Sequence, residues 1–331
     1  MQGQIDKILQ QQEGSFAKKG IGWGLLAGLG WGLDCTLMGM ALGMAPLAGG
    51  ISLFAAPLVG SCLHDGFAAL WIFLKNFVDG RWRDYLRTLR TRPARFILIG
   101  SFLGGPIGMS CNLLAIYFAG ASYTTAITAA YPAIGALLGA IFLKEKISRR
   151  VWVGIFTAIL GSFVVGYVPP AGDQYPHFYL GIGLAAVAAL GWAMEGVFST
   201  YGMDLVDSDI AIGIRQLASF IVYFFVVLPI AGSVAYKILL ESLTSPVFLF
   251  IAGIAMVGSI SYTSWYRAMN MTGVGRAMGL NVTYALWSVL FGWLLVNLTI
   301  TPNLLAGVIL ICIGTILTIG SPKDLVNLRS K

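Results

Sequence analysis

The chain has 331 residues, of which 57% are hydrophobic and 11% are charged, and its formal net charge is +7. Together with a mean hydropathy of +0.82, this composition excludes an ordinary soluble domain, whose core needs far fewer apolar residues. We therefore predict an all-α integral membrane protein. We expect the positive charge to mark membrane orientation rather than nucleic-acid binding.

Ten apolar segments follow one another along the chain, each of about 20 residues, enough for a helix to cross roughly 30 Å of hydrocarbon. They cover residues 21–42, 50–74, 96–118, 122–143, 151–168, 177–201, 209–231, 247–269, 274–296 and 302–320. When the N-terminus is placed inside the cell, nearly all Lys and Arg residues fall on the cytoplasmic side. The sequence thus predicts a multi-pass protein of the cell (inner) membrane with two cytoplasmic tails, residues 1–20 and 321–331.

The basic loop at residues 75–95 carries Trp82, Tyr85, Leu86 and Leu89 at helical spacing. This pattern is typical of a short helix that lies on anionic lipid. An ordinary basic loop that faces the cytoplasm explains the same residues equally well.

The two halves of the chain resemble each other at a shift of 153 residues. This shift places Tyr131 on Tyr284, Gly120 on Gly273, Gly139 on Gly292, Gly154 on Gly307 and Gly161 on Gly314. Membrane composition alone explains part of these matches, because glycines are frequent where helices pack closely. We predict two five-helix repeats, residues 21–168 and 177–320. Because five is odd, the second repeat must cross the membrane in the inverted orientation.

A related pentapeptide occurs once in each half, inside an apolar segment: Gly30-Trp31-Gly32-Leu33-Asp34 and Gly191-Trp192-Ala193-Met194-Glu195. An acid at bilayer depth usually marks a substrate or proton pathway, and residues three apart share a helix face. We interpret Glu195 as a substrate-binding or proton-binding group in preference to a structural hydrogen-bonding group. For Asp34, a role in the pathway and a pairing near the outer mouth are equally supported.

The other ionisable groups predicted to lie in the membrane have more than one interpretation. His64 and Asp65 are neighbours about 100° apart on a helix. We expect one to line the pathway while the other pairs with a polar group on an adjacent helix. We expect Arg215 to be a structural charge that snorkels or pairs with Asp204, Asp207 and Asp209.

Aromatic residues cluster on single faces of two later segments, with Tyr262, Trp265 and Tyr266 on one and Tyr284 and Trp287 on the other. Aromatic faces attract quaternary ammonium groups, which have no N–H donors for a polar pocket. The competing interpretation is an interfacial belt, and it suits Trp23, Trp71, Trp152 and Trp293 near the segment ends.

The sequence contains no phosphate-binding loop, metal-binding His and Glu motif, or nucleophile elbow. All four cysteines lie within the predicted spans, where they behave as small apolar residues. We therefore predict that the chain is not an enzyme, needs no cofactor or metal, and is not driven by ATP.

Residues 131–161 resemble the EamA-type repeat of the drug/metabolite transporter superfamily. The strings that carry the resemblance are Tyr131-Pro132-Ala133-Ile134 and Leu143-Lys144-Glu145-Lys146-Ile147-Ser148, followed by Gly154 and Gly161. The resemblance extends over both halves. It implies a ten-helix fold with a central cavity formed by the first four helices of each half, and with the fifth and tenth helices packed outside.

A narrower resemblance is to the Lic-type choline permeases. It is carried by Gly105-Pro106-Ile107-Gly108-Met109 with Asn112, His64-Asp65, Trp192 with Glu195, Ile214-Arg215-Gln216, Ile260-Ser261-Tyr262 with Tyr266, and Gly279-Leu280-Asn281-Val282 with Tyr284 and Trp287. It implies proton-coupled import of choline, with an aromatic cage and an acid around the headgroup. Carried over to this chain, the cage would comprise Trp31, Trp192, Glu195, Tyr262 and Tyr266.

We accordingly expect a secondary transporter for choline or a similar quaternary ammonium compound, working as a monomer or homodimer in the bilayer. Tyr284 and Trp287 are further substrate-binding candidates, and Asp34, His64, Asp65, Asn112 and Asn281 are candidates for the pathway or for proton coupling. Asp34 departs from the family pattern, and a second negative charge fits either a dication such as a polyamine or a proton-coupling group. Because sequence does not separate import from export when either is driven by a gradient, an exporter of cationic metabolites, polyamines or drugs is the main alternative. A scaffold that transports nothing is a third.

Overall fold

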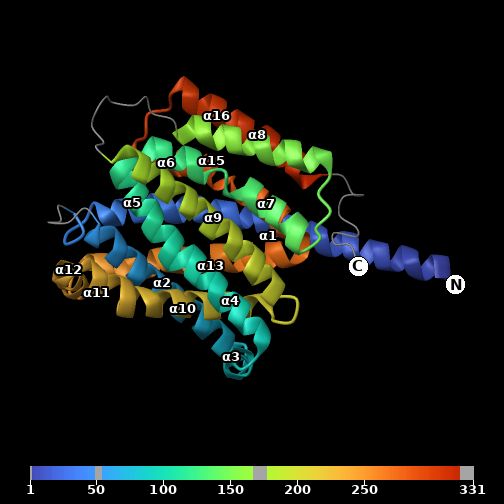
Figure 1. Cartoon of the computed structure of the whole chain (residues 1–331), viewed down its shortest axis with the longest axis horizontal. Coiled ribbons are helices and arrows are strands. Elements are labelled where there is room, and N and C mark those ends of the chain that lie inside the picture. Colours follow the sequence, from blue (N-terminus) through green and yellow to red (C-terminus); the bar gives the residue numbers. More distant parts are fainter. Residues whose placement is uncertain (1, 49–53, 167–176, 321–331) are drawn as a thin grey trace.

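The computed structural model describes residues 2–48, 54–166 and 177–320, and every regular element in these ranges is helical (Figure 1). The first half contains α1 (Gln2–Leu42), α2 (Ala55–Val78), α3 (Trp82–Leu89), α4 (Arg92–Phe102), the π-helical segment η1 (Leu103–Met109), α5 (Ser110–Ala119), α6 (Ala121–Thr128), α7 (Tyr131–Phe142) and α8 (Arg149–Gly166). The second half contains α9 (Phe178–Gly202), α10 (Ser208–Val222), the π-helical segment η2 (Tyr223–Val227), α11 (Leu228–Ala231), α12 (Ser233–Leu243), α13 (Pro246–Thr272), α14 (Val274–Asn281), α15 (Tyr284–Val296) and α16 (Pro302–Ile319).

Nine of the predicted spans correspond to helices that are long and apolar enough to cross a membrane within the described residues. The tenth, predicted over 122–143, is divided into α6 and α7 by a turn at residues 129–130. Pro132 lies in the first turn of α7, where its missing N–H costs no helical hydrogen bond. The count of ten spanning helices therefore stays a prediction.

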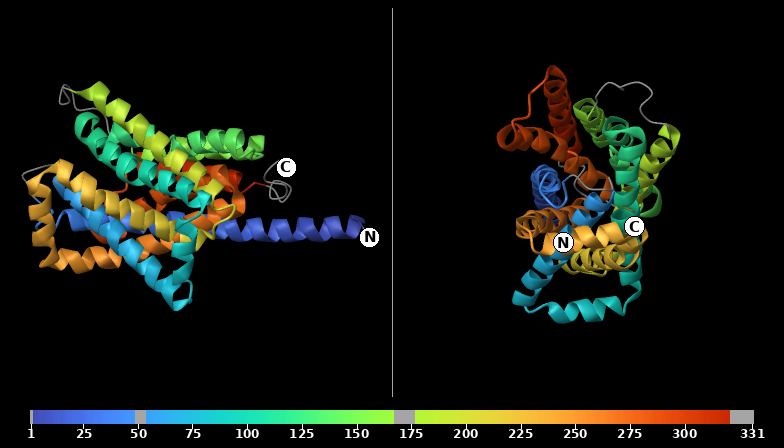
Figure 2. Two further views of the ribbon diagram at one scale, coloured as in Figure 1. Left: turned by 60° about the horizontal axis from the view of Figure 1, so that its bottom comes forward. Right: turned by 90° about the vertical axis from the view of Figure 1, so that its left-hand side faces the viewer.

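The structure describes one of the two predicted tails, and that tail is helical. Residues 2–20 belong to α1, which begins at Gln2 and whose first turns project beyond the bundle (Figure 2). The predicted tail at 321–331 lies outside the described residues. The basic loop does form a short helix, α3, which buries Tyr85 and leaves Trp82, Leu86 and Leu89 exposed.

Unusual backbone conformations recur in the two halves at the predicted shift. Gly120 and Gly273 have φ values of 84° and 85°, and Lys144 and Asn297 have φ values of 55° and 54°. The turn between α6 and α7 likewise recurs between α14 and α15. A membrane-like composition does not account for matched left-handed backbone at positions without glycine, so the two halves share one structural plan.

The last helices of the two halves, α8 and α16, lie side by side at the edge of the bundle (Figure 1). An added Cβ at Gly154 would lie 2.7 Å from the carbonyl oxygen of Gly314, and one at Gly161 would lie 2.7 Å from that of Gly307. Because the residue numbers rise along α8 as they fall along α16, the two helices run antiparallel. Equivalent helices that meet antiparallel through equivalent glycines are the arrangement that an inverted repeat requires.

Candidate functional site

A cavity of about 430 Å³ lies inside the bundle, between helices of both halves. Its lining includes most of the residues that the sequence singled out: Trp31, Asp34, His64, Asp65, Trp192, Glu195, Arg215, Tyr262, Asn281 and Tyr284. These residues lie on α1, α2, α9, α10, α13, α14 and α15. Positions far apart in the sequence thus meet at one place.

Three of the predicted site residues do not line this cavity. Tyr266 is fully buried behind it, where its hydroxyl donates to Glu195 Oε1 at 3.2 Å. Trp287 packs against Gly32 of α1 and stacks on Phe291. Asn112 on α5 is also absent from the lining. The expectation that Tyr266 forms part of a cage around a ligand is therefore wrong in this structure, and its contacts position Glu195 instead.

Aromatic rings form two parts of the cavity wall. The rings of Trp31 and Tyr262 meet edge to face with centroids 5.1 Å apart, and those of Tyr131 and Trp192 meet with centroids 6.0 Å apart. The sequence interpretation did not assign Tyr131 to the site, although its match with Tyr284 in the repeat was a usable signal. Trp265 also lines the cavity. The wall thus draws aromatic groups from α1, α7, α9, α13 and α15.

The Gly-Gly-Pro-Ile-Gly run of η1 allows α9 to approach closely. Pro106 lies inside this π-helical segment, and π-helical turns of this kind are frequent at functional sites. The carbonyl oxygen of Gly104 accepts a hydrogen bond from Trp192 Nε1 at 3.0 Å. A Cβ at Gly104 would collide with the carboxylate of Glu195. This position therefore requires glycine for a close approach rather than for backbone freedom.

Gly104→Ala is expected to lower the free energy of unfolding by about 1–3 kcal/mol, because the added methyl group overpacks the Glu195 carboxylate. Gly253→Ala on α13 is the matched control, since nothing lies within 4 Å of its added Cβ. Alanine is favoured over glycine in helices, so this control is expected to be neutral or slightly stabilising. Thermal unfolding of both variants in detergent tests the prediction, which an equal effect of the two substitutions would contradict.

Glu195 forms a two-pronged ion pair with Arg215. The Nε atom of Arg215 donates to Oε1 at 2.7 Å, and its Nη2 donates to Oε2 at 3.2 Å. Arg215 also lies 3.8 Å from Asp65 Oδ2 and donates to Gln216. The expectation that Arg215 snorkels or pairs with Asp204, Asp207 and Asp209 is wrong, because its side chain points into the cavity toward α9. Glu195 is accordingly not an isolated acid.

His64 lies between two carboxylates. Its Nε2 is 2.8 Å from Asp34 Oδ2, and its Nδ1 is 3.6 Å from Asp65 Oδ1. Asp65 also accepts a hydrogen bond from Ser219 at 2.6 Å. Both His64 and Asp65 line the cavity, so the expectation that only one of them does so is wrong. The expected pairing with a polar group on an adjacent helix is made by Asp65, which bonds to Ser219 of α10.

The cavity has an excess of acidic groups. Among the described residues that line it, the carboxylates are Asp34, Asp65 and Glu195, while the basic groups are the guanidinium of Arg215 and the imidazole of His64. The lining is therefore negative whether or not His64 carries a proton. Such an excess at bilayer depth favours occupation by a cation.

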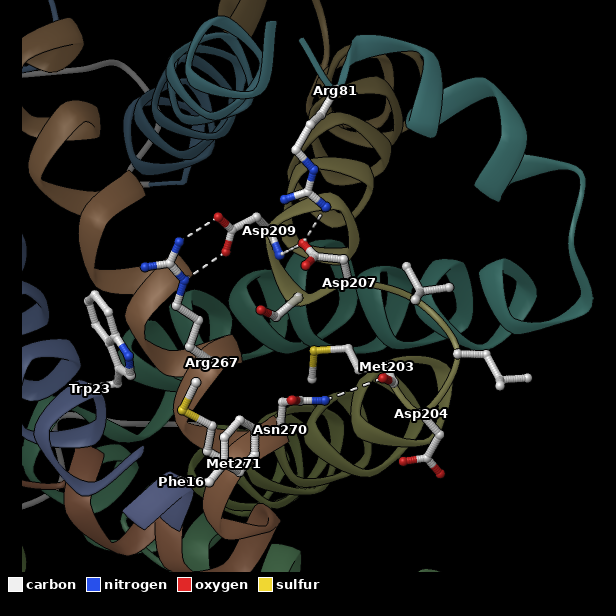
Figure 3. Close-up of a pocket in the computed structure, with 13 residues that line it drawn as sticks. Phe16, Trp23, Arg81, Met203, Asp204, Asp207, Asp209, Arg267, Asn270 and Met271 are labelled. Atoms are coloured by element: carbon white, nitrogen blue, oxygen red, sulfur yellow. Dashed lines mark hydrogen bonds and ion pairs between the residues drawn. The ribbon is translucent and has the colours of Figure 1, made fainter. Parts of the chain in front are cut away.

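A second cluster of charges lies at the end of the bundle where α1 projects; Figure 3 draws its Arg81, Asp207, Asp209 and Arg267. Asp209 accepts from Arg267 Nε at 2.8 Å, from Arg267 Nη2 at 2.5 Å and from Lys75 at 2.9 Å. Arg81 pairs with Asp207 at 2.9 Å. We call these five residues the ion cluster. It connects α2 and the start of α3 with α10 and α13, and so joins the two halves at this end.

Trp23 of α1 contacts the ion cluster through Arg267. The guanidinium of Arg267 lies 4.6 Å from the centroid of its ring (Figure 3). Trp23 was expected to be an interfacial anchor, and in the structure it also makes this cation–π contact. A pocket of about 610 Å³ lies between the ion cluster, the middle of α1 at Phe16 and Trp23, and the adjoining ends of α9 and α13.

Spanning helices, two structurally matched halves and a polar cavity at their centre define a multi-pass membrane transport protein. Residues 18–167 and 179–320 each match the EamA-like transporter family, and the chain belongs to that family. Protein LicB of Haemophilus influenzae is 31% identical over 231 residues, which cover 67% of this chain and 74% of LicB. This match confirms the predicted resemblance to Lic-type proteins. One solved crystal structure superimposes with a TM-score of 0.71 at 16% identity, over 91% of this chain and 96% of the other, and this likeness concerns the fold alone.

Proposed function

We propose that this transporter carries out proton-coupled import of choline or a similar quaternary ammonium compound by alternating access. Its membership in a transporter family supports transport in general. The chemistry of the cavity supports a cationic substrate and coupling to protons.

The observation that carries the proposal is the combination of aromatic rings with excess negative charge in one cavity. A quaternary ammonium group donates no hydrogen bonds, so ring faces and unneutralised carboxylates suit it better than a polar pocket. Trp31 and Tyr262 form the wall beside Asp34, while Trp192 and Tyr131 form another part. Tyr284 and Asn281 complete the lining that we assign to the substrate.

The ion pair between Glu195 and Arg215 changes the role that we assign to Glu195. Its charge is locally balanced by Arg215, so it cannot be the only counter-ion for a cationic substrate in this conformation. Asp34 and Asp65 then supply most of the attraction. Glu195 and Arg215 instead position Trp192 and Tyr262 through α9 and the contact of Arg215 with the Tyr262 ring, whose centroid is 5.4 Å away.

The ends of the cavity support alternating access. We infer that the ion cluster closes the cavity at the end from which α1 projects, because its ion pairs join the two halves there. Toward the opposite end, the cavity is lined by Met38, Gly39 and Leu42 of α1 and by Leu113 and Ile116 of α5. With both termini placed in the cytoplasm, this arrangement corresponds to a carrier that is closed on the cytoplasmic side.

Trp31→Ala is expected to weaken choline binding, because each ring contributes about 0.5–2 kcal/mol of cation–π attraction. This loss corresponds to about a twofold to thirtyfold higher Kd. Binding and uptake of radiolabelled choline by the purified protein in proteoliposomes, with and without an inward proton gradient, measure the effect. Trp293→Ala is the matched control, since this tryptophan is 51% exposed on α15 and does not line the cavity.

The same vesicles distinguish the alternatives. Absence of choline uptake combined with efflux of polyamines or toxic organic cations would support the exporter. Absence of any ligand-dependent thermal stabilisation would support the scaffold, because a bound ligand at 100 times its Kd stabilises by about 2.7 kcal/mol. Normal choline uptake by Trp31→Ala would reject the site assignment while leaving the choice of substrate intact.

A further inference from the structure

We propose that His64 binds the co-transported proton, and that one proton moves with each monovalent substrate cation. This inference rests on the proposed function, which it makes more specific. It is carried by the placement of the imidazole between two carboxylates and by the total charge of the cavity.

The geometry assigns different roles to the two ring nitrogens of His64. Asp34 is an acceptor when ionised, so the short contact of 2.8 Å requires the proton of a neutral ring to be on Nε2. Nδ1 faces Asp65 Oδ1 at 3.6 Å. The second proton therefore adds at Nδ1 and leaves from the same atom, while no bond of the substrate is formed or broken.

The groups around His64 favour its protonated form only in part. Asp34 on α1 and Asp65 on α2 stabilise an imidazolium through their negative charge. Arg215 on α10 opposes it, with Nη1 3.8 Å from Asp65 Oδ2. Tyr262 on α13 presents a ring with its centroid 6.1 Å from that of His64, and Tyr223 of η2 is a buried hydroxyl near the same side of α2. These opposing charges suit a group that gains and loses a proton during transport.

The side chains of this group are nearly enclosed, because His64 and Asp65 are each 6% exposed and Asp34 is 4% exposed. The backbone of α13 covers the contact between Asp34 and His64, since a Cβ at Gly258 would lie 2.5 Å from Asp34 Oδ2 and 2.7 Å from His64 Nε2. All three residues nevertheless line the cavity. A proton therefore reaches His64 through the same space as the substrate.

Charge balance gives the ratio of protons to substrate. With neutral His64, the three lining carboxylates exceed the one guanidinium of Arg215 by two negative charges. One proton on His64 and one monovalent cation in the cavity bring the site to neutrality. Moving an uncompensated charge through the low-dielectric bundle is costly. The fully loaded site is therefore the form best able to change conformation, and this requirement couples the two ions.

His64→Gln is expected to remove the response of choline accumulation to the proton gradient. In proteoliposomes, an inward proton gradient should no longer increase the accumulation of radiolabelled choline by the variant, and its exchange of radiolabelled for unlabelled choline should be slower than that of the wild type, because the site loaded with choline alone keeps one negative charge. The matched control is His177→Gln, because the chain contains only these two histidines and His177 precedes α9 outside the cavity. In the wild type, reversal-potential measurements should give one proton per choline.

A second measurement does not depend on whether His64→Gln folds. In the His177→Gln protein, His64 is the remaining histidine of the chain, so ¹⁵N-histidine NMR reports on it alone. In the presence of choline, its ring is expected to convert between neutral and doubly protonated forms over the pH range in which uptake depends on the proton gradient. A ring that stays in one form throughout that range overturns the proposal.

The outcomes separate the two proposals. Wild-type protein that neither binds nor takes up choline contradicts the proposed function. Wild-type protein that shows coupled uptake, together with a His64→Gln variant that is equally coupled, contradicts only the role of His64. A ratio other than one proton per choline contradicts the charge-balance argument.

Discussion

Replacing Arg215 by methionine is expected to lower the free energy of unfolding by about 3–5 kcal/mol, the effect of removing one partner from a buried ion pair. The guanidinium is 4% exposed and faces both Glu195 and Asp65. Without it, two buried carboxylates have lost their cation. The measurement is thermal or denaturant unfolding of the purified protein in detergent.

Two further variants isolate the ion pair from general effects of the substitution. Arg150→Met makes the same substitution at an exposed position. Its free energy of unfolding is expected to stay within about 0.5 kcal/mol of the wild-type value. Adding Glu195→Gln to Arg215→Met removes one of the two stranded charges and should recover part of the lost stability. The interpretation is wrong if Arg215→Met and Arg150→Met have equal effects.

Under the proposed function, Asp209→Asn is expected to abolish concentrative uptake by weakening the ion cluster, which joins the two halves at the end where α1 projects. Asp209 is 4% exposed and holds both Arg267 and Lys75. Neutralising it leaves two cations near each other across the junction of the halves, where like charges repel. The population should therefore shift toward a conformation that is open at this end.

Access to the cavity can be measured with a single engineered thiol. Gly39 lines the cavity and has nothing within 4 Å of an added Cβ, so Gly39→Cys in a variant without the native cysteines provides the label site. In Asp209→Asn, labelling by a membrane-impermeant maleimide from the side of the ion cluster should rise several-fold. Asp84→Asn is the control, because this acid is 38% exposed in its side chain and forms only long ion pairs, with Arg81 at 3.6 Å and with Arg87 at 3.7 Å. Unchanged labelling in Asp209→Asn would show that the ion cluster does not close the cavity.

The membrane spans and much of the cavity lining could be predicted from the sequence. Apolar segments about 20 residues long form helices in lipid, because their backbone groups must be hydrogen-bonded within the segment. This made nine of the spans predictable. Acidic side chains at the centre of such segments almost always face the interior of the bundle. The tryptophans three residues before them share that helix face. Trp31, Asp34, Trp192, Glu195 and Tyr262 therefore proved to share one cavity.

The partners of the charged residues could not be predicted, because they depend on how helices rotate against one another. Arg215 and Glu195 are 20 residues apart on different helices. No sequence pattern shows which face of each helix is turned toward the other. Trp265 and Tyr266 are adjacent, yet one lines the cavity while the other supports Glu195 from behind. The turn between α6 and α7 was also missed, because the surrounding residues remain apolar on both sides of it.

The contact between α8 and α16 determines which movements are open to the protein. The glycines of both helices bring the two main chains into direct contact. Sliding one helix along the other would therefore cause steric clashes. The contact lies at the edge of the bundle, away from the ion cluster. If the halves rock, this pair is the natural pivot, and the largest displacements then fall on α2, α10 and the other helices farthest from it.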